Sequence, residues 1–494
     1  MKITAENAAA CDVYVQFLFE GQPVSLTGEE GKIANAAIAK KEFEGKEGTQ
    51  LLIRSAGGKR LLVGMGKEKE FEIDALRVGA ARAACFARET NAKSMRFKYS
   101  KGAVVAAKGV RAYAQAITEG TLLSLYKFDK YKTGEDAQKQ REKKLDAVCI
   151  ECSAAQKGEV WSAIKYACAV CEGENFARDV GNEAGKDALP VEIAKTVAKM
   201  AHENGIKCRV LGKKECEKGR MGLYLSVAAG SAHEPAFVVL EYWPRGAHET
   251  VCLVGKGVTF DSGGISLKPS KDMEKMKHDK CGAAAVYGSL LAAAKLKLPV
   301  RVIGITPLVE NLPSGSATKP GDIVKAANGK TVEILNTDAE GRLILADALL
   351  YAQKYKPSAI VDLATLTGAV AVALGPHAAG VLGNSSELIA KVKEAGESTH
   401  ERVWELPLWK EYFEVTKGEF ADIKNVGDGD AGTIVAAAFL ASFVEEKTPW
   451  AHIDIAATGY SYKPKGYNMQ AGATGFGVRL LAHMLSKWKR MKKK

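Results

Sequence analysis

The sequence predicts an α/β protein in which a smaller N-terminal α/β domain is joined by a helix to a larger C-terminal α/β domain with a mostly parallel, helix-covered central sheet. With 494 residues, of which 47% are apolar and 26% charged, the chain is long enough for two globular domains. Its second part alternates helical segments with strand-like runs that are apolar throughout. Such runs are typical of strands that helices cover on both faces. They lie at residues 237–242, 251–254, 300–305, 360–364 and 453–456.

Residues 1–153 are expected to form the smaller domain. Short apolar runs at 13–19, 50–53 and 60–64 alternate there with helix-like segments such as 73–89. A charge-dense stretch before the last strand of this domain favours an exposed loop. We expect that loop at residues 129–146, a linker helix at 154–180 and the larger domain at 181–494.

Several locations and partners are excluded or disfavoured by composition. No window holds the roughly 18 uninterrupted apolar residues that a membrane helix requires. Glu6 and Asp12 interrupt the segment where a signal peptide needs continuous apolar residues, so we expect a cytoplasmic protein with reduced cysteines. The formal charge of +12 is concentrated in the first 150 residues and in the tail. Basic patches attract nucleic acid, but we favour a solvated surface over a DNA partner. The basic side chains of the tail are Lys487, Lys489, Arg490, Lys492, Lys493 and Lys494.

Four of the ten cysteines have a spacing that fits a structural zinc site. Cys149, Cys152, Cys168 and Cys171 follow the pattern C-x2-C-x15-C-x2-C. The first pair ends an apolar, strand-like run, and the second lies on one face of a predicted helix. Neither pair is flanked by the glycines and turn residues of a zinc knuckle. Buried thiols that pack as small apolar groups are therefore the favoured interpretation.

Three common catalytic motifs are missing. Four His-Glu dipeptides lack the second histidine of H-E-x-x-H. The sequence GKT at 329–331 lacks the earlier glycine of a phosphate-binding loop, because Val324 stands there. There is also no G-x-S-x-G nucleophile motif.

Acidic residues beside glycines follow strand-like runs between residues 253 and 368, where an α/β domain normally places its ligand site. Taken singly, Asp279 and Asp338 could cap helices, and Glu340 would suit a first helical turn. Taken together, three aspartates and a glutamate in one crevice would repel one another unless divalent cations neutralise them. We therefore predict a pair of ions that share bridging carboxylates. The charged residues of this region that we single out as candidates are Lys256, Asp261, Lys268, Asp279, Asp338, Glu340 and Arg342.

Four segments closely resemble the signature segments of the leucyl aminopeptidase family, hexameric two-metal enzymes that include bacterial aminopeptidase A. These segments are GKGVTFDSGGISLK, MKHDKCGAA, NLPSGSATKPGD and NTDAEGRLILADAL. The resemblance extends over roughly residues 175 to 485 and is most specific in NTDAEGRL. The first 150 residues resemble the N-terminal domain of the family only in size and α/β character.

The resemblance implies two metal sites, for Mn²⁺ or Zn²⁺. One ion would be held tightly by Lys256, Asp261, Asp279 and Glu340. A more exchangeable ion would be held by Asp261, Glu340 and Asp338, the last through both its side chain and its backbone carbonyl. A lysine coordinates only as the neutral amine, so Lys256 is expected to lose its proton through metal competition and burial.

The resemblance also implies roles in catalysis and substrate binding. Lys268 would stabilise the oxyanion of the scissile carbonyl. Arg342, helped by the backbone at Leu366, would hold a bicarbonate ion that acts as proton shuttle. An apolar pocket would accept a leucine-like side chain, and it would be roomier than in relatives that carry methionine at the position of Ala473. The implied substrate contacts are Met276, Asn336, Thr365, Gly368 and Ala473.

The sequence therefore predicts a cytoplasmic, metal-dependent aminopeptidase of the leucyl aminopeptidase type. It would act on peptides with a free N-terminus and assemble as a homohexamer, as the family does. The alternative is a DNA-binding accessory or regulatory protein on the same scaffold, which the basic first domain and tail motivate.

Overall fold

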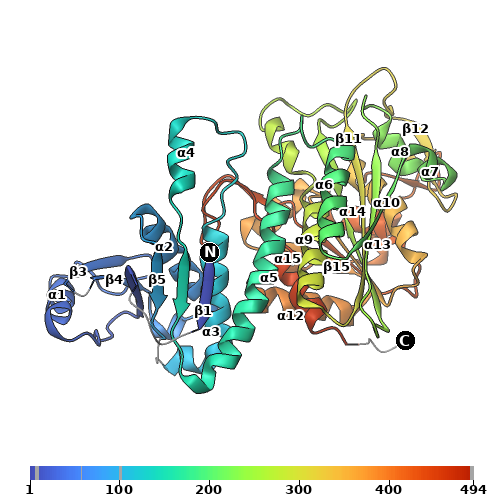
Figure 1. Cartoon of the computed structure of the whole chain (residues 1–494). Helices are drawn as coiled ribbons and strands as arrows, with labels where there is room; N and C mark the ends of the chain where they lie inside the picture. Colours follow the sequence, from blue (N-terminus) through green and yellow to red (C-terminus); the bar gives the residue numbers. More distant parts are fainter. Residues whose placement is uncertain (6–10, 57, 100–102, 490–494) are drawn as a thin grey trace. The chain divides into compact units, whose positions relative to one another are not determined.

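The computed structural model describes residues 1–5, 11–56, 58–99 and 103–489. The chain forms two compact units, which are described separately (Figure 1). Unit 1 consists of Met1–Cys171 and Lys463–Ala471, and unit 2 of Glu172–Tyr462 and Gly472–Lys494. The segment at 463–471 belongs to unit 1 because Tyr467 packs there in an apolar cluster with Ala81, Leu123 and Cys171. Of the predicted basic tail, Arg490, Lys492, Lys493 and Lys494 lie outside the described residues.

Unit 1 is a six-stranded sheet with helices, as its alternating pattern predicts. The strand order is β1-β6-β5-β2-β4-β3, and only the β3–β4 pair is antiparallel. The strands are β1 (Lys2–Ala5), β2 (Val13–Leu18), β3 (Gln50–Ser55), β4 (Gly58–Gly64), β5 (Ser94–Phe97) and β6 (Ala147–Ile150). The helices are α1 (Gly28–Ala39), η1 (Glu68–Glu70), α2 (Ile73–Glu89), α3 (Ala103–Ser124), α4 (Glu135–Glu142) and η2 (Ala154–Gln156).

The expected exposed loop at 129–146 is wrong in one respect, because it contains the helix α4. This helix buries none of its residues, and two acidic residues stand in its first turn, where they interact favourably with the helix dipole. High polarity therefore indicated exposure correctly but hid a helix that has no apolar face.

The two cysteine pairs lie where the sequence indicates, at β6 and the residues directly after it and on the long helix α5 (Lys157–Asn182). The ten cysteines all lie within the described residues, and they form no disulfide bond.

Unit 2 is built around a nine-stranded, mixed sheet whose centre is parallel. The order is β16-β15-β18-β14-β9-β11-β8-β7, with β10 paired to β11. Strands β18, β14, β9 and β11 run parallel to one another. Strand β8 runs antiparallel to both β11 and β7, and β15 runs antiparallel to β18 but parallel to β16. The strands are β7 (Lys207–Leu211), β8 (Ala236–Tyr242), β9 (Thr250–Gly255), β10 (Gly257–Asp261), β11 (Arg301–Asn311), β14 (Ala359–Ala364), β15 (Ala379–Gly383), β16 (Val403–Glu405) and β18 (Trp450–Asp454).

Helices cover both faces of this sheet, which confirms the predicted fold class (Figure 1). Val251 and Leu253 of β9 pack into one apolar cluster with α6, α9, α12 and α15, and the alternate residues Cys252 and Val254 pack into another with α8, α10 and α14. The remaining helices of unit 2 are α6 (Pro190–Glu203), α7 (Lys213–Lys218), α8 (Gly222–Ala228), η3 (Met273–His278), α9 (Cys281–Leu296), α10 (Glu340–Gln353), α11 (Gly368–Leu374), η4 (Gly375–His377), α12 (Ser386–Thr399), α13 (Lys410–Glu414), α14 (Gly432–Ala441) and α15 (Val478–Ser486).

Unit 2 also contains two small sheets. One strand of the central sheet begins three residues earlier than the sequence predicts. The strand expected at 453–456 is β18, which begins at Trp450 because Trp450, Ala451 and His452 are fully buried. The polar His452 interrupted the apolar run in the sequence. No helix in the described part of the chain is both long and apolar enough to cross a bilayer. The small sheets contain β12 (Asp322–Lys325), β13 (Thr331–Ile334) and β17 (Ile423–Lys424), and β19 (Tyr460–Ser461) and β20 (Gly472–Ala473).

Helices α5 and α9 cross at two facing glycines, and this contact gives a test of the packing. A Cβ atom added at Gly173 would lie 2.3 Å from the carbonyl oxygen of Gly288, which is backbone and cannot rotate away. G173A is therefore expected to lower the free energy of unfolding by about 1–3 kcal/mol. Urea unfolding followed by circular dichroism measures this change.

The matched control is Gly158 on the same helix, because a Cβ atom there meets nothing within 4 Å. G158A should leave stability unchanged or raise it by up to about 1 kcal/mol. Equal stability of the two variants would show that α5 and α9 do not approach as closely as the structure has them.

Candidate functional site

The charged residues predicted as a site meet at the carboxyl ends of adjacent strands of unit 2. Lys256 follows β9 directly, and Asp261 is the last residue of β10. Glu340 begins α10, with Asp338 two residues earlier, and Asp279 follows the short helix η3. This edge is where parallel sheets place their ligands, because the loops from neighbouring strands converge there.

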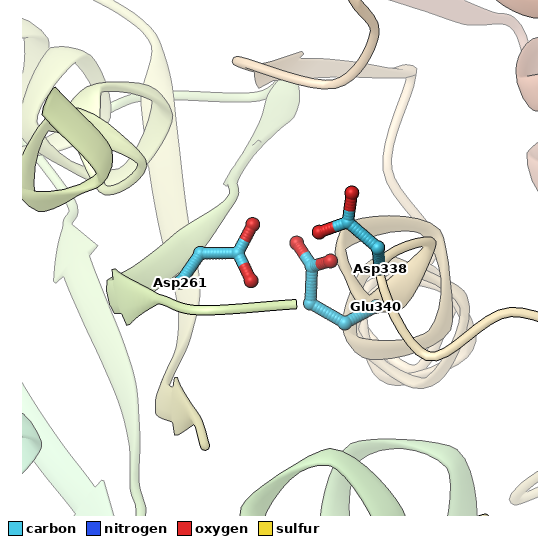
Figure 2. Close-up of side chains that lie close together, drawn as sticks. All are labelled: Asp261, Asp338 and Glu340. Carbon is cyan, nitrogen blue, oxygen red and sulfur yellow. The ribbon is translucent and has the colours of Figure 1, made fainter. Parts of the chain in front are cut away.

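Three of the carboxylates are close enough to share one ion. Each of Asp261, Asp338 and Glu340 offers an oxygen atom such that these atoms lie within 4.8 Å of one another. Figure 2 shows the three carboxylate groups pointing toward one another, with Asp338 and Glu340 at the start of a helix. Asp261 and Glu340 are only 2% and 1% exposed.

Two lysines tie these carboxylates and Asp279 into one cluster. The Lys256 ammonium lies 2.8 Å from Asp279 Oδ2 and 2.8 Å from Glu340 Oε1. The Lys268 ammonium lies 2.8 Å from Asp261 Oδ2 and also forms an ion pair with Asp338. The six side chains therefore form a compact arrangement in which two positive charges face four carboxyl groups.

Asp279, Asp338 and Glu340 have raised pKa values, so these carboxyl groups hold their protons more tightly than isolated ones. Burial and the neighbouring Asp261 raise the pKa of Glu340 to about 8, against the opposing effect of Lys256. Burial also raises the pKa of Asp279 to about 6, although Lys256 lowers it in part. The pKa of Asp338 is raised by burial and then by Asp261. Ionisation of all four carboxyl groups at once is therefore unfavourable unless further cations are bound.

The pKa values of the two lysines are raised, although burial alone would lower them. Burial lowers the pKa of Lys256, but Asp279, Glu340 and Asp261 together raise it well above its ordinary value. Burial also lowers the pKa of Lys268, but Asp261, Glu340 and Asp338 together raise it above its ordinary value. Burial favours loss of the Lys256 proton but does not by itself outweigh the three carboxylates, so competition from a metal ion would also be needed to remove it.

Several carboxylate oxygens of the cluster lack hydrogen-bond donors, and this shows whether the site is suited to divalent metal ions. Asp279 Oδ2, Asp338 Oδ1 and both oxygens of Glu340 are buried, yet none accepts a hydrogen bond of acceptable geometry. Three of these four oxygens face a lysine only at ion-pair distance. Buried oxygens with free lone pairs and shared neighbours are the ligands that hard divalent cations prefer, so the residues fit such ions.

Asn311, which sequence reasoning did not single out, holds two of the acidic segments together. Its Nδ2 group donates to Asp261 Oδ1 at 2.8 Å and to the carbonyl oxygen of Thr337 at 3.0 Å. The Gly263 N–H also donates to Asp261 Oδ1, at 2.9 Å. Asn311 is the first residue of the segment NLPSGSATKPGD and ends β11, so its place at a strand end could have marked it.

Arg342 and Leu366, expected around an anion, have partners in the protein. Arg342 donates from Nη1 to the carbonyl oxygen of Asn425 at 2.7 Å, while its buried Nε has no partner. Burial lowers the pKa of the Arg342 guanidinium to about 10. The Leu366 N–H donates to Asp454 Oδ1 at 3.1 Å, so an anion would compete with Asp454 for this group. Asn425 and Asp454 were not among the predicted residues.

Of the five expected substrate contacts, Thr365 and Asn336 form hydrogen bonds with residues of the cluster. Thr365 donates its hydroxyl to Asp279 Oδ1 at 2.7 Å, and its carbonyl oxygen accepts from Lys256 at 2.9 Å. The Asn336 side chain accepts the N–H of Asp338 at 2.8 Å, which places it beside the cluster. The other three positions are Met276 on η3, the exposed Gly368 at the start of α11, and Ala473, which is 7% exposed in β20.

The chain is similar to one protein family over most of its length. Residues 175–482 match the catalytic domain of the cytosol aminopeptidase family, and residues 21–135 match its N-terminal domain. A relative from Roseiflexus castenholzii, named probable cytosol aminopeptidase, is 44% identical over 453 residues, which cover 90% of this chain and 91% of the relative. One from Geobacter sp. strain M21, with the same name, is 43% identical over 95% of this chain and 94% of the relative.

Solved structures show the same fold. The bottromycin maturation enzyme BotP in complex with Mn matches with a TM-score of 0.86 and 33% identity, over 97% of this chain and 99% of that one. A mutant of tomato leucine aminopeptidase matches with a TM-score of 0.88 and 32% identity, over 99% of this chain and 96% of that one.

The raised pKa values predict that metal binding releases protons. At pH 7 Glu340, with a pKa of about 8, is mostly protonated, and Lys256 carries its charge. Both must lose a proton to coordinate an ion, so affinity for Mn²⁺ should rise as pH increases from 6 to 8. Calorimetric titration in buffers with different heats of ionisation counts the protons, and about one or more per chain is expected at pH 7.

The variant E340Q should release fewer protons than the wild-type chain, since its amide carries no titratable proton. Metal binding that releases no protons, with an affinity independent of pH, would contradict the electrostatic description of the cluster.

Proposed function

The chain belongs to the cytosol aminopeptidase family of metal-dependent peptidases, and on this premise we propose that it removes leucine-like residues from the free N-terminus of peptides with two divalent ions. The observation that carries the proposal is the cluster of four carboxyl groups and two lysines at the carboxyl edge of the parallel sheet. Burying so many carboxylate oxygens costs free energy unless cations compensate their charge.

Two overlapping sets of residues would hold the ions, which we propose to be Mn²⁺ or Zn²⁺. The tighter ion would use Lys256, Asp261, Asp279 and Glu340. The more exchangeable one would use Asp261, Asp338 and Glu340, whose oxygens already lie within 4.8 Å of one another. Manganese is supported by the Mn complex of the similar enzyme BotP. When bound, the ions would lower the pKa of a water and polarise the scissile carbonyl, and they would bind the free amine of the substrate.

Lys268 is the residue that we propose to stabilise the oxyanion of the reaction. Its side chain is 21% exposed, whereas that of Lys256 is 4% exposed, so Lys268 is the lysine that a substrate can reach. Its ammonium faces Asp261 and Asp338 now and can turn on its flexible stem toward the carbonyl oxygen. A positive donor at that oxygen stabilises the developing charge.

Arg342 is proposed to hold bicarbonate near the cluster, with help from the Leu366 N–H. The buried, unpartnered Nε of Arg342 supports an anion at this position. Bicarbonate would supply a proton shuttle, a role for which the lysines, with their raised pKa, are poorly suited near neutral pH.

The substrate pocket is proposed to include Met276, Asn336, Thr365, Gly368 and Ala473. Thr365 supports this because it contacts both Asp279 and Lys256, so a side chain bound near it would lie next to the cluster. Alanine at position 473 would leave room for residues larger than leucine.

We also propose that the chain acts in the cytoplasm as a homohexamer. The relatives are named for the cytosol. Several large apolar side chains of unit 2 are exposed in the single chain, as expected for surfaces that other copies cover. They include Val372 at 90%, Phe420 at 75%, Trp404 at 65% and Trp409 at 63% exposure.

Removal and return of metal tests the proposed activity. Dialysis against a chelator should abolish hydrolysis of leucinamide, and Mn²⁺ or Zn²⁺ should restore it, because the ions activate the water. An N-acetylated leucine peptide is the control, since its blocked amine cannot bind a metal. A folded chain that stays inactive with metal, or that cleaves only the blocked peptide, would refute the proposal.

K268M tests the role of Lys268 separately from metal binding. Loss of the oxyanion donor should lower kcat by about 10²–10³-fold. Metal content, measured by elemental analysis, should stay at the wild-type level. The exposed Lys271 of the same loop gives the control K271M, which should keep wild-type kcat. An unchanged kcat in K268M would remove Lys268 from the mechanism.

A further inference from the structure

Two buried polar residues that the proposed mechanism does not use flank Asp279. His278 is 1% exposed and Lys280 is fully buried. Asp279 itself lies between the end of η3 and the start of α9, outside both helices. Thr365 and Lys256 contact its side chain, but its backbone is held only as firmly as this short connection is held.

Both flanking side chains reach the C-terminal end of α5. His278 Nδ1 lies 3.0 Å from the carbonyl oxygen of Gly181, and the Lys280 ammonium donates to the carbonyl oxygen of Glu183 at 3.1 Å. The same ammonium donates to the carbonyl oxygen of Lys277, the residue before His278. The last carbonyls of a helix lack partners within the helix, so they are natural acceptors for these donors.

The histidine is fixed on both sides of its ring. A carbonyl oxygen only accepts hydrogen bonds, so Nδ1 carries the proton toward Gly181. Nε2 lies 3.1 Å from the hydroxyl of Tyr462, and the ring stacks on Tyr460 with centroids 5.2 Å apart. Such a ring has little freedom to turn.

Lys280 has an unusual environment for a lysine. Its ammonium is inside the protein, and the acceptors of both of its hydrogen bonds are uncharged backbone carbonyls. Burial of an ammonium without a carboxylate partner is costly, and an apolar side chain would fill the same space without that cost. What Lys280 adds over an apolar side chain is its pair of hydrogen bonds to backbone carbonyls.

The end of α5 is also tied to another part of the site. Asn182 Oδ1 accepts the N–H of Ala473 at 2.8 Å, so three consecutive residues of this segment each hold a neighbouring element. Gly181 makes the close approach possible, because a Cβ atom there would lie 2.5 Å from the Cβ of Ala473. The segment 181–183 thus acts as a common support.

We propose that His278 and Lys280 are positioning residues that fix Asp279 and the neighbouring Met276 against the C-terminal end of α5. This inference rests on the proposed function for the role of Asp279 as a metal ligand. Without the tethers, η3 would shift and Asp279 would leave its place near Lys256. The tighter metal site would then weaken, and substrate binding near Met276 would weaken with it.

The first test compares K280M with K277M. Methionine keeps the length of the lysine stem but cannot donate, and K277M makes the same change three residues earlier while its backbone carbonyl remains. Titration with Mn²⁺ should show at least about tenfold weaker binding at the tighter site in K280M, with a raised KM for leucinamide. K277M should bind Mn²⁺ and substrate like the wild-type chain.

The second test uses two replacements of His278. Asparagine places a donor near the position of Nδ1, whereas glutamine reaches only the position of Nε2. H278N should therefore keep the bond to Gly181 and wild-type Mn²⁺ affinity, and H278Q should bind Mn²⁺ as weakly as K280M. A purely structural role would lower the stability of both variants and leave the Mn²⁺ affinity of the folded protein unchanged.

Each outcome decides the inference. Folded K280M and H278Q with wild-type Mn²⁺ affinity and KM would overturn it, while the proposed function would stand if the wild-type chain binds Mn²⁺ and cleaves leucinamide. A wild-type chain that binds no Mn²⁺ would overturn both. If K280M does not fold, the difference between H278N and H278Q gives the answer.

Discussion

The mutual repulsion of four carboxyl groups in one small volume is the constraint on which the rest of the catalytic unit depends. Asp261 and Glu340 are almost fully buried, and the pKa of Glu340 is raised to about 8. In the protein alone, the ammonium groups of Lys256 and Lys268 compensate these charges in part. Oxygens that accept no hydrogen bond remain, so the cluster is incomplete without further positive charge. Burying these oxygens costs folding free energy, and the oxygens left without hydrogen bonds fit divalent cations.

The fold makes this arrangement possible by converging rigid elements on one edge of a sheet. Parallel strands bring Lys256, Asp261 and Asn311 to that edge, and apolar residues on both faces hold the strands in place. Asn311 joins two acidic segments, and Thr365 joins Asp279 to Lys256. The acidic residues therefore sit on supports that are stiffer than the loops that carry them.

Sequence reasoning recovered the features that depend on local pattern. Continuous apolar runs predicted the central strands, and charged residues beside glycines marked the cluster, which the structure brings together. Long-range partners left no such pattern. Asn425, which accepts from Arg342, and Asp454, which accepts the Leu366 N–H, lie 83 and 88 residues beyond their partners, and only the folded chain brings them together. The pKa of Lys256 was also out of reach, because it depends on the balance of burial against three carboxylates at short range.

The central claim is that this cluster holds two cations, and anomalous diffraction from crystals grown with Mn²⁺ tests it most directly. The account predicts two peaks per chain in the anomalous difference map collected near the manganese edge. One peak should lie among Lys256, Asp261, Asp279 and Glu340, and the other between Asp338 and the two shared carboxylates. A map with no peak in the cluster, with a single peak at full occupancy under excess Mn²⁺, or with peaks only elsewhere would contradict it.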